Sequence, residues 1–533
     1  MPSDDVPMSI ADLDLVQGAA LVLLIWSCVV FTVQIIGTYK IFRHNSAPLP
    51  PPIAPTLAED DIPHVTLIRP VKGVDIGLYE CLASSFRLAY PRSKLEIRLC
   101  VESADDPAYP ILQQVVADFP DFDAKVLVEE DDPILHGIGG HVNNLGPNPK
   151  IRNISRAYRE AKGDVIWIVD CNIWTAKNSI GRMVDKLCGF RDKGRATPYK
   201  FVHQLPVVVN IEGHAMDESQ SLLSGNVAAQ GSSSDFGGRI EEMFMSTTHA
   251  KFYSAINTVG IAPCIVGKSN MFRKAHLDRF TDPAQNPILD ESEASRGRGI
   301  DFFSSYICED HLIGDLIWRS ALPGYKNHGL VFGELAIQPM SGMSVSAYIA
   351  RRVRWLRVRK WTVLAATLVE PGVESLLCCL YFSFAVTTLP WAHQKLGVPQ
   401  TWLAMGCIWL FMVTVWMLVD RAFSSKLQKC QSIDVDEDTP SFARGTSRPW
   451  GTRRRPFREW LAAWLGREFL ALPIWTWAVL LGTTVNWRNR QFRVRMDMSV
   501  VEVGGEKSPK ENGLASHTNG FSTPRSRSKG RID

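Results

Sequence analysis

Two aspartates follow apolar runs of strand length, and this placement constrains the fold more than any other feature. Asp170 comes directly after residues 164–169, and Asp106 comes shortly after residues 95–101. Short apolar runs rich in β-branched residues predict buried strands. In open α/β sheets, ligands bind outside the carboxyl ends of the strands. The sequence therefore predicts an α/β domain whose ligand site includes both acids.

The runs around these two strands alternate with polar stretches that suit helices, such as residues 110–118 and 150–162. This alternation favours a mainly parallel sheet covered by helices. The predicted strands are residues 64–69, 95–101, 124–128, 164–169, 200–209 and 261–266.

An apolar segment near the start, residues 13–36, is long enough to cross about 30 Å of hydrocarbon as a helix. Acids precede it, and Lys40, Arg43 and His44 follow it. The positive-inside rule then places the following domain in the cytosol. Further spans are predicted near residues 373–392, 402–419 and 469–485. Simple alternation would carry the basic residues after the last span to the lumen, against the charge rule, so its topology stays open.

These features divide the chain into an anchored domain with membrane segments at both ends. Polar insertions near residues 216–238 and 282–300, and a third at 428–455, are too poor in apolar residues to offset their ordering entropy, so we expect mobile loops. The predicted divisions are a lumenal segment 1–12, an anchor 13–36, a Pro-rich linker 37–61, a cytosolic domain 62–360, a C-terminal membrane region 361–495 with a polar and basic loop 421–467, and a disordered tail 496–533.

Composition argues against two kinds of site, a nucleic-acid-binding surface and a cysteine-based zinc site. The net charge is +3, and no basic stripe interleaves with aromatic residues, so nucleic acid is not an expected partner. The eleven cysteines include no C-x-x-C pair and no cluster with His at zinc spacing. They are interpreted as reduced packing residues.

The order of the polar motifs carries a family resemblance. After Asp106 and Asp170 come Asp310, in Cys-Glu-Asp-His-Leu, and the run Arg351-Arg-Val-Arg-Trp355. This set, flanked by apolar spans, resembles the inverting family-2-like membrane glycosyltransferases, whose nucleotide-sugar-binding domain is an α/β domain of the GT-A type. The blocks at residues 67–75, 148–151 and 203–206 bring it closest to the branch that transfers glucose from UDP-glucose to ceramide.

The resemblance implies a role for each motif residue. Asp106 would contact the nucleotide, and Asp170 would coordinate the diphosphate and a divalent cation, Mg²⁺ or Mn²⁺. Asp310 would be the catalytic base that deprotonates the acceptor hydroxyl, with Glu309 as the alternative acid and an exposed pair at a helix cap as the structural alternative. Arg351, Arg354 and Trp355 would form the diphosphate and acceptor signature. The segment Asp170-Cys-Asn172 departs from the family's paired aspartates, since it offers one carboxylate and one amide.

Further residues are carried over with less weight. The resemblance places Lys72 and Asp75 beside the nucleotide base or ribose, Lys150 at the diphosphate and His203 in the active site, with a satisfied structural side chain as the alternative at each. The other basic residues of the Arg-Trp segment are interpreted as facing lipid; they are Arg352, Arg357, Arg359 and Lys360.

The expected reaction is transfer of glucose, with inversion, to the primary hydroxyl of ceramide in the Golgi or endoplasmic reticulum membrane. The expected partners are UDP-glucose, ceramide and the lipid bilayer. A polysaccharide synthase of the chitin, cellulose or hyaluronan type and a dolichyl-phosphate sugar transferase remain enzymatic alternatives. An inactive membrane scaffold with the same fold is the non-enzymatic alternative.

Overall fold

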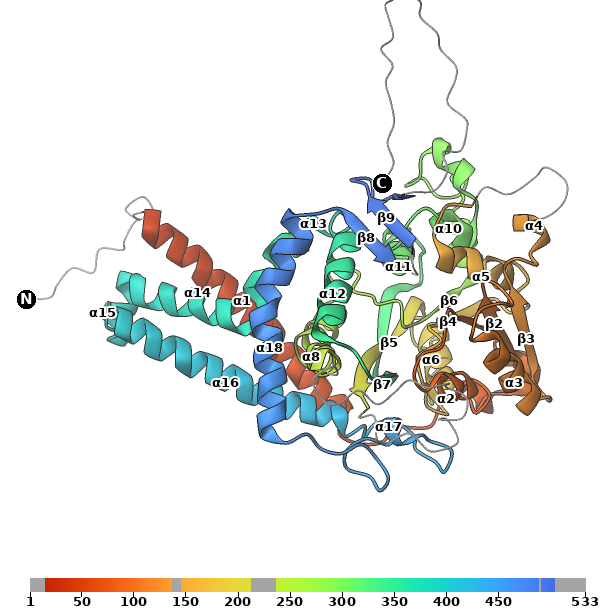
Figure 1. The fold of residues 1–533 in the computed structure, drawn as a ribbon, viewed down its shortest axis with the longest axis horizontal. Helices are drawn as coiled ribbons and strands as arrows, with labels where there is room; N and C mark the ends of the chain where they lie inside the picture. The colour runs from red at the N-terminus through yellow and green to blue at the C-terminus, as the bar shows by residue number, and fades with distance from the viewer. Residues whose placement is uncertain (1–14, 137–144, 212–235, 488–489, 504–533) are drawn as a thin grey trace, which may run out of the picture.

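The computed structural model describes residues 15–136, 145–211, 236–487 and 490–503. A seven-stranded sheet forms the centre of an α/β domain, in the order β3-β2-β1-β4-β6-β5-β7 (Figure 1). Within it β6 runs antiparallel to both of its neighbours, and the other strand pairs are parallel. The strands are β1 Val65–Pro70, β2 Leu95–Val101, β3 Asp123–Val128, β4 Val165–Val169, β5 Tyr199–Asn210, β6 Ser269–Arg273 and β7 Lys326–Met340.

The central strands are buried on both faces, as expected when helices cover a parallel sheet. Along β1, Leu67 belongs to the core of one face and Ile68 to the core of the other. The first core includes residues of α2, α3 and α6, and the second includes residues of α5, α10 and α11. These helices are α2 Leu78–Ala83, α3 Tyr109–Asp118, α5 Pro149–Arg159, α6 Ser179–Cys188, α10 Lys274–Phe280 and α11 Glu309–Arg319.

The mainly parallel α/β sheet is confirmed, and five of the six predicted strands coincide with β1 to β5. The prediction at residues 261–266 is wrong, because the strand there is β6 at Ser269–Arg273. Cys264 instead lies in a loop, where its backbone carbonyl accepts a hydrogen bond from the Asn257 side chain at 2.9 Å. Strand β7 was not predicted.

The predicted mobile loops have different outcomes. Most of the insertion at 216–238 lies outside the described residues. The insertion at 282–300 contains a 3₁₀ turn, Glu291–Arg296, that begins with a capping box on Asp290. The segment 428–455 is packed rather than loose: Cys430, Ile433 and Phe442 are buried in the core that also holds residues of β5 and β7. A few apolar side chains are therefore enough to fix this polar segment.

Apolar helices extend away from the sheet on one side (Figure 1). Among the described residues, two helices are long and apolar enough to cross a membrane, α1 (Leu15–His44) and α16 (Trp402–Gln428). A pair bent by 77°, Leu364–Val373 and Ser375–Thr388, would make a third span. Helix α1 packs against α14 (Ser375–Thr388), and α14 packs against α16. The short helix α15 (Pro390–Leu396) follows α14 at the far end of this bundle.

Helix α18 (Phe457–Trp475) crosses the base of this bundle instead of running along it (Figure 1). Just before it, Arg455 lies 3.7 Å from Glu242 of α8 (Phe236–Phe244). After it, β8 (Thr484–Trp487), β9 (Arg490–Val494) and β10 (Val500–Glu502) form a small antiparallel sheet. Val500 of that sheet donates its backbone N–H to Ser305 of the α/β domain.

The segments before and after α18 both contact the α/β domain, because Arg455 also donates to the carbonyl of Asn210 in β5. The predicted span at 469–485 is not among the described helices that are long and apolar enough to cross a membrane, since α18 ends at Trp475, a π-helical turn continues to Leu480, and a strand begins at Thr484. In the middle of α18, Arg467 is buried and pairs with Glu374 at 2.9 Å. The remaining helices are α4 Pro133–His136, α9 Ala250–Val259, α12 Val345–Arg359, α13 Leu364–Val369 and α17 Ser441–Arg444.

Candidate active site

Asp170 lies at the carboxyl end of β4 between two lysines. Its Oδ1 is 3.0 Å from Nζ of Lys150, and its Oδ2 is 3.0 Å from Nζ of Lys268. Burial would raise the pKa of the Asp170 carboxyl, but the two ammonium groups hold this pKa well below its usual range. The carboxylate is therefore ionised, and its side chain remains 23% exposed.

Lys150 lies in the first turn of α5 and joins Asp170 to a second acid. Its Nζ is 3.2 Å from Oε1 of Glu309, the first residue of α11. Asn148 caps α5 through its side-chain oxygen, and its Nδ2 donates to Oε2 of Glu309 at 3.1 Å. Burial raises the pKa of Glu309, and Lys150 opposes this shift. Glu309 is thus buried and bonded on both oxygens.

Asp310 differs from Glu309 in both respects. Its side chain is partly exposed, and within the described ranges its carboxylate has no hydrogen bond or ion pair. A Cβ on Gly267 would lie 2.6 Å from Oδ2 of Asp310, so only glycine permits this approach. Both residues line a pocket of about 340 Å³, counted with its solvent-open space, together with Lys150 and Glu309. Of the two neighbouring acids, Asp310 is the one with an available carboxylate.

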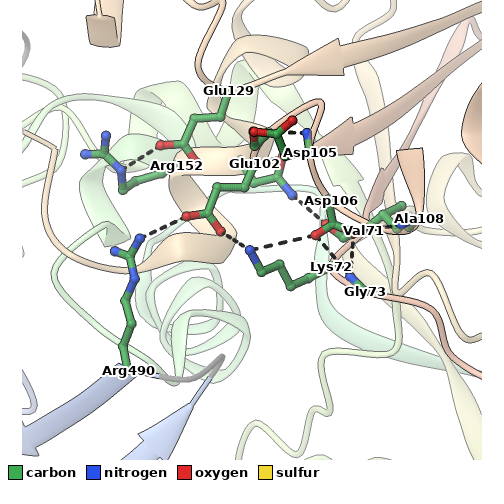
Figure 2. Close-up of polar contacts among 12 residues, drawn as sticks. Val71, Lys72, Gly73, Glu102, Asp105, Asp106, Ala108, Glu129, Arg152 and Arg490 are labelled. Carbon is green, nitrogen blue, oxygen red and sulfur yellow. Dashed lines mark hydrogen bonds and ion pairs between the residues drawn. The ribbon is translucent and has the colours of Figure 1, made fainter. Parts of the chain in front are cut away.

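Asp106 links the loops that follow β1 and β2. Its carboxylate accepts hydrogen bonds from the backbone N–H groups of Gly73 and Ala108, both at 2.9 Å. Lys72 extends between Asp106, at 3.7 Å, and Glu102, at 2.7 Å (Figure 2). The Asp106 side chain is only 2% exposed. In this conformation its main contacts are therefore structural, and its predicted contact with a nucleotide stays a prediction.

The small C-terminal sheet also contacts the loop after β2. Arg490, the first residue of β9, lies 2.9 Å from Glu102 on the side opposite Lys72 (Figure 2). Glu102 therefore connects the α/β domain to a segment almost 400 residues later in the chain.

The loop after β4 is held by hydrogen bonds with a buried arginine of β1 and with an acid of the loop after β1. Arg69, fully buried in β1, donates to the carbonyls of Asp170 and Ile173 at 2.9 and 2.8 Å. The side-chain Nδ2 of Asn172 donates a hydrogen bond to the Asp75 carboxylate at 2.8 Å. Asp75 thus lies beside the Asp170 loop, and these contacts set the direction of that loop.

His203 is a core residue of β5 with no exposed surface. The hydroxyl of Tyr253 lies 2.5 Å from its Nδ1, and the side-chain oxygen of Asn257 lies 3.2 Å from its Nε2. Burial lowers the pKa of His203 to about 3, so the ring is neutral near pH 7. This geometry favours the structural alternative, and it gives His203 no direct access to the pocket around Asp310, whose lining residues do not include it.

The Arg-Trp segment forms helix α12, which follows β7. Arg351 pairs with the fully buried Glu241 of α8 at 2.9 Å, and its guanidinium lies over the Trp355 ring, 4.7 Å from the centroid. Trp355 packs against Phe244 and Met340, next to the carboxyl ends of β5 and β7. Trp355 therefore lies at the same edge of the sheet as Asp170.

The other basic residues of this segment make contacts within the protein, and the prediction that they face lipid stays a prediction. Arg352 is buried, with its guanidinium 3.6 Å from the centroid of the Phe244 ring. Arg357 donates to the carbonyl of Thr484 at 2.7 Å, and Lys360 donates to that of Val479 at 2.6 Å. Arg359 pairs with Glu370. Each of these four charges therefore has a partner in the folded protein, in α8, at Glu370 or in residues 479–484.

Oxygen ligands for a divalent cation are few. No group of three or more His, Cys, Asp or Glu side chains with metal-site geometry occurs in the part of the chain that the structure describes. Near Asp170, the side-chain oxygen of Asn172 is buried without a hydrogen-bond partner in that same part. Hard cations such as Mg²⁺ prefer oxygen ligands and complete their shell with phosphate oxygens and water. Asp170 and Asn172 fit a cation that is shared with a diphosphate.

The sequence analysis did not predict three residues of this region, which are Lys268, Glu102 and Arg490. Lys268 had the clearest signal, because it directly precedes a strand, but its position opposite Asp170 depends on the antiparallel pairing of β4 with β6. Arg490 and Glu102 are brought together only by the folded chain.

Comparison with known proteins identifies the family. Glycosyl transferase family 21 matches residues 21–215 and 285–500. The chain is 57% identical over 505 residues to a ceramide glucosyltransferase of Pyricularia oryzae, covering 94% of this chain and 98% of that protein. It is 50% identical to a ceramide glucosyltransferase of Gibberella zeae, covering 98% and 99% of the two chains.

A more distant likeness is found among solved structures. A mannosyltransferase from Pyrobaculum calidifontis, in complex with GDP-Man and Mn²⁺, has a TM-score of 0.36 and 15% identity, covering 78% of this chain and 99% of that one.

Proposed function

The chain belongs to glycosyl transferase family 21, and we propose that it transfers glucose from UDP-glucose to the primary hydroxyl of ceramide, forming β-glucosylceramide. It is a glycosyltransferase, and its close relatives carry the name ceramide glucosyltransferase over nearly their whole length. The donor, the acceptor and the stereochemistry are the proposed parts.

The observation that carries the proposal is the free Asp310 carboxylate beside a cationic pair. In the proposed reaction the acceptor hydroxyl gives its proton to Asp310 while its oxygen bonds to C1 of glucose. The bond from C1 to the diphosphate oxygen breaks, and its electron pair leaves with UDP. Because attack occurs opposite the leaving group, an α-linked donor gives a β-glycoside.

The leaving diphosphate needs positive charge. Lys150 and Lys268 lie on either side of Asp170 and can supply it. A divalent cation, Mg²⁺ or Mn²⁺, would add charge at the diphosphate, and Asp170 with the Asn172 amide oxygen would hold it. Preorganised charges of this kind act where charge develops in the transition state.

The remaining motif residues are proposed to bind the rest of the donor and the acceptor. Lys72, Asp75 and Asp106 lie in the loops after β1 and β2, where we propose that the uridine rests. Arg351, Arg354 and Trp355 would border the diphosphate and the acceptor at the edge where α12 meets the sheet. Contact between Arg351 and the Trp355 ring supports a shared wall.

We also propose that the α/β domain faces the cytosol of the Golgi or endoplasmic reticulum, with α1, the bent helix pair and α16 in the bilayer. Basic residues lie in the last turn of α1, on the domain side. The basic C-terminal sheet contacts the same domain, so it satisfies the positive-inside rule. Helix α18 would then lie along the membrane surface and expose Phe469 and Leu472 to lipid.

An acceptor comparison tests this function. Purified protein in detergent is given labelled UDP-glucose with ceramide, with dolichyl phosphate or without lipid acceptor. The proposal expects lipid-soluble label only with ceramide. Transfer to dolichyl phosphate, or a polymer formed without lipid, would support one of the rival reactions instead.

A further inference from the structure

Lys268 is the residue of the candidate site that the sequence did not predict, and its contacts support a more specific role than charge at the diphosphate. It is 8% exposed, and its ammonium is held directly against Asp170 Oδ2. The backbone fixes the same pairing, because the N–H of Asp170 donates to the carbonyl of Lys268 at 3.0 Å. This contact continues the antiparallel register of β4 and β6, in which Val169 opposes Ser269. Its position is therefore built into the sheet.

The charges around Lys268 are arranged in an alternating chain. Lys268 contacts Asp170, Asp170 contacts Lys150, and Lys150 contacts Glu309. Both oxygens of Asp170 are thus in contact with ammonium groups, and a cation that uses this carboxylate must displace at least one of them. The ammonium on Oδ2 makes no other hydrogen bond or ion pair within the described ranges, whereas Lys150 is also held by Glu309.

We propose that Lys268 occupies the cation's place on Asp170 when the site is empty and moves to the donor diphosphate when UDP-glucose binds. The inference rests on the proposed function, since it takes a nucleoside diphosphate as the ligand. Lys268 would be the mobile partner because it has one acid to leave, while Lys150 has two. The exchange frees a carboxylate oxygen of Asp170 for the divalent cation as the diphosphate arrives.

Loss of Lys268 should change the affinity for UDP and the affinity for the divalent cation in opposite directions. A lysine that binds the diphosphate contributes to UDP affinity, and its loss should weaken binding about tenfold or more, as for a hydrogen bond to a charged group. A lysine that competes with a cation for Asp170 lowers cation affinity in the absence of nucleotide. Its loss should therefore strengthen binding of the cation alone. A merely structural lysine would not change the two affinities in opposite directions.

The test uses the full-length protein in detergent and two binding measurements, neither of which needs turnover. UDP affinity is measured by calorimetry in EDTA, and Mn²⁺ affinity is measured by electron paramagnetic resonance without nucleotide. Lys268→Met should weaken UDP binding about tenfold or more and tighten Mn²⁺ binding severalfold. Lys268→Arg keeps a cation in place and should restore most of the UDP affinity.

Lys274→Met is the matched control. Lys274 follows the same strand at its other end and makes a partly exposed ion pair with Asp278 at 3.4 Å. It should leave both affinities unchanged, and all variants should keep the thermal midpoint of the wild type within a few degrees. If Lys268→Met does not fold, Lys268→Arg is compared with the wild type instead. The proposal then requires that Lys268→Arg keep most of the UDP affinity, and a large loss of that affinity would overturn it.

The outcomes separate this inference from the function on which it rests. Wild-type protein that binds no UDP would overturn both. Wild-type protein that binds UDP, with Lys268→Met binding it equally well, would overturn the role of Lys268 alone. Weaker Mn²⁺ binding in Lys268→Met would also overturn the exchange.

Discussion

Replacing Asp310 by Asn tests the assignment of the base. A positioned base contributes about 10²–10⁴-fold to the rate, which corresponds to about 3–5 kcal/mol of activation free energy. Because the Asp310 carboxylate makes no hydrogen bond or ion pair in the described part of the chain, the amide leaves no buried partner unpaired. Lys150 keeps both of its acids. Turnover should therefore fall at least about 100-fold, while UDP affinity and the thermal midpoint stay near the wild type.

The matched variant is Glu309→Gln. Glu309 is buried and bonded to Lys150 and Asn148, so its change should affect the position of Lys150 more than proton transfer. Initial rates of glucosylceramide formation at saturating UDP-glucose, together with UDP affinity from calorimetry, separate the two effects. We expect the smaller loss of turnover in Glu309→Gln. An inactive Glu309→Gln together with an active Asp310→Asn would refute the reasoning and make Glu309 the base.

Three further predictions concern orientation, the Arg-Trp segment and pH. Sealed vesicles with their cytosolic face outward should turn over added UDP-glucose without detergent, and activity that appears only after detergent would contradict the cytosolic domain. Arg354→Lys should lose far more activity than Arg359→Lys, because bidentate contacts with phosphate need a guanidinium while the pair with Glu370 needs only charge; equal losses would contradict this. Burial lowers the pKa of Lys200 to about 8, below its value of about 10.4 in the unfolded chain. The unfolded state therefore binds the proton more tightly between these values, and the free energy of unfolding should rise with pH across that window in the wild type but not in Lys200→Met.

The strands that carry the site could be predicted from the sequence because their signal is local. Strands β1, β2 and β4 are continuous apolar runs, and Asp170 is placed by its position after one of them. Strand β7 was missed because Gly329, Gly333 and Pro339 interrupt its apolar pattern, although the strand continues through all three. Its pairing with β5 compensates for weak local propensity.

The partners of the site residues could not be predicted because they depend on distant pairing. Lys268 meets Asp170 only through the register of β4 and β6, across 98 residues. Arg352 and Arg357 were assigned to lipid because they belong to a basic run beside a predicted span, since nothing local shows that Phe244 and Thr484 fold against them. The same limit explains α18: its apolar content resembles a span, but Arg467 in its middle faces a buried acid.

The stereochemistry of the isolated product tests the central claim most directly. Purified protein is incubated with UDP-glucose and ceramide, and the anomeric configuration of the glycolipid is read from its proton coupling in nuclear magnetic resonance. We predict glucose linked β to the primary hydroxyl of ceramide. An α-linked product, a different sugar or acceptor position, or no glycolipid under conditions where UDP binds would contradict it.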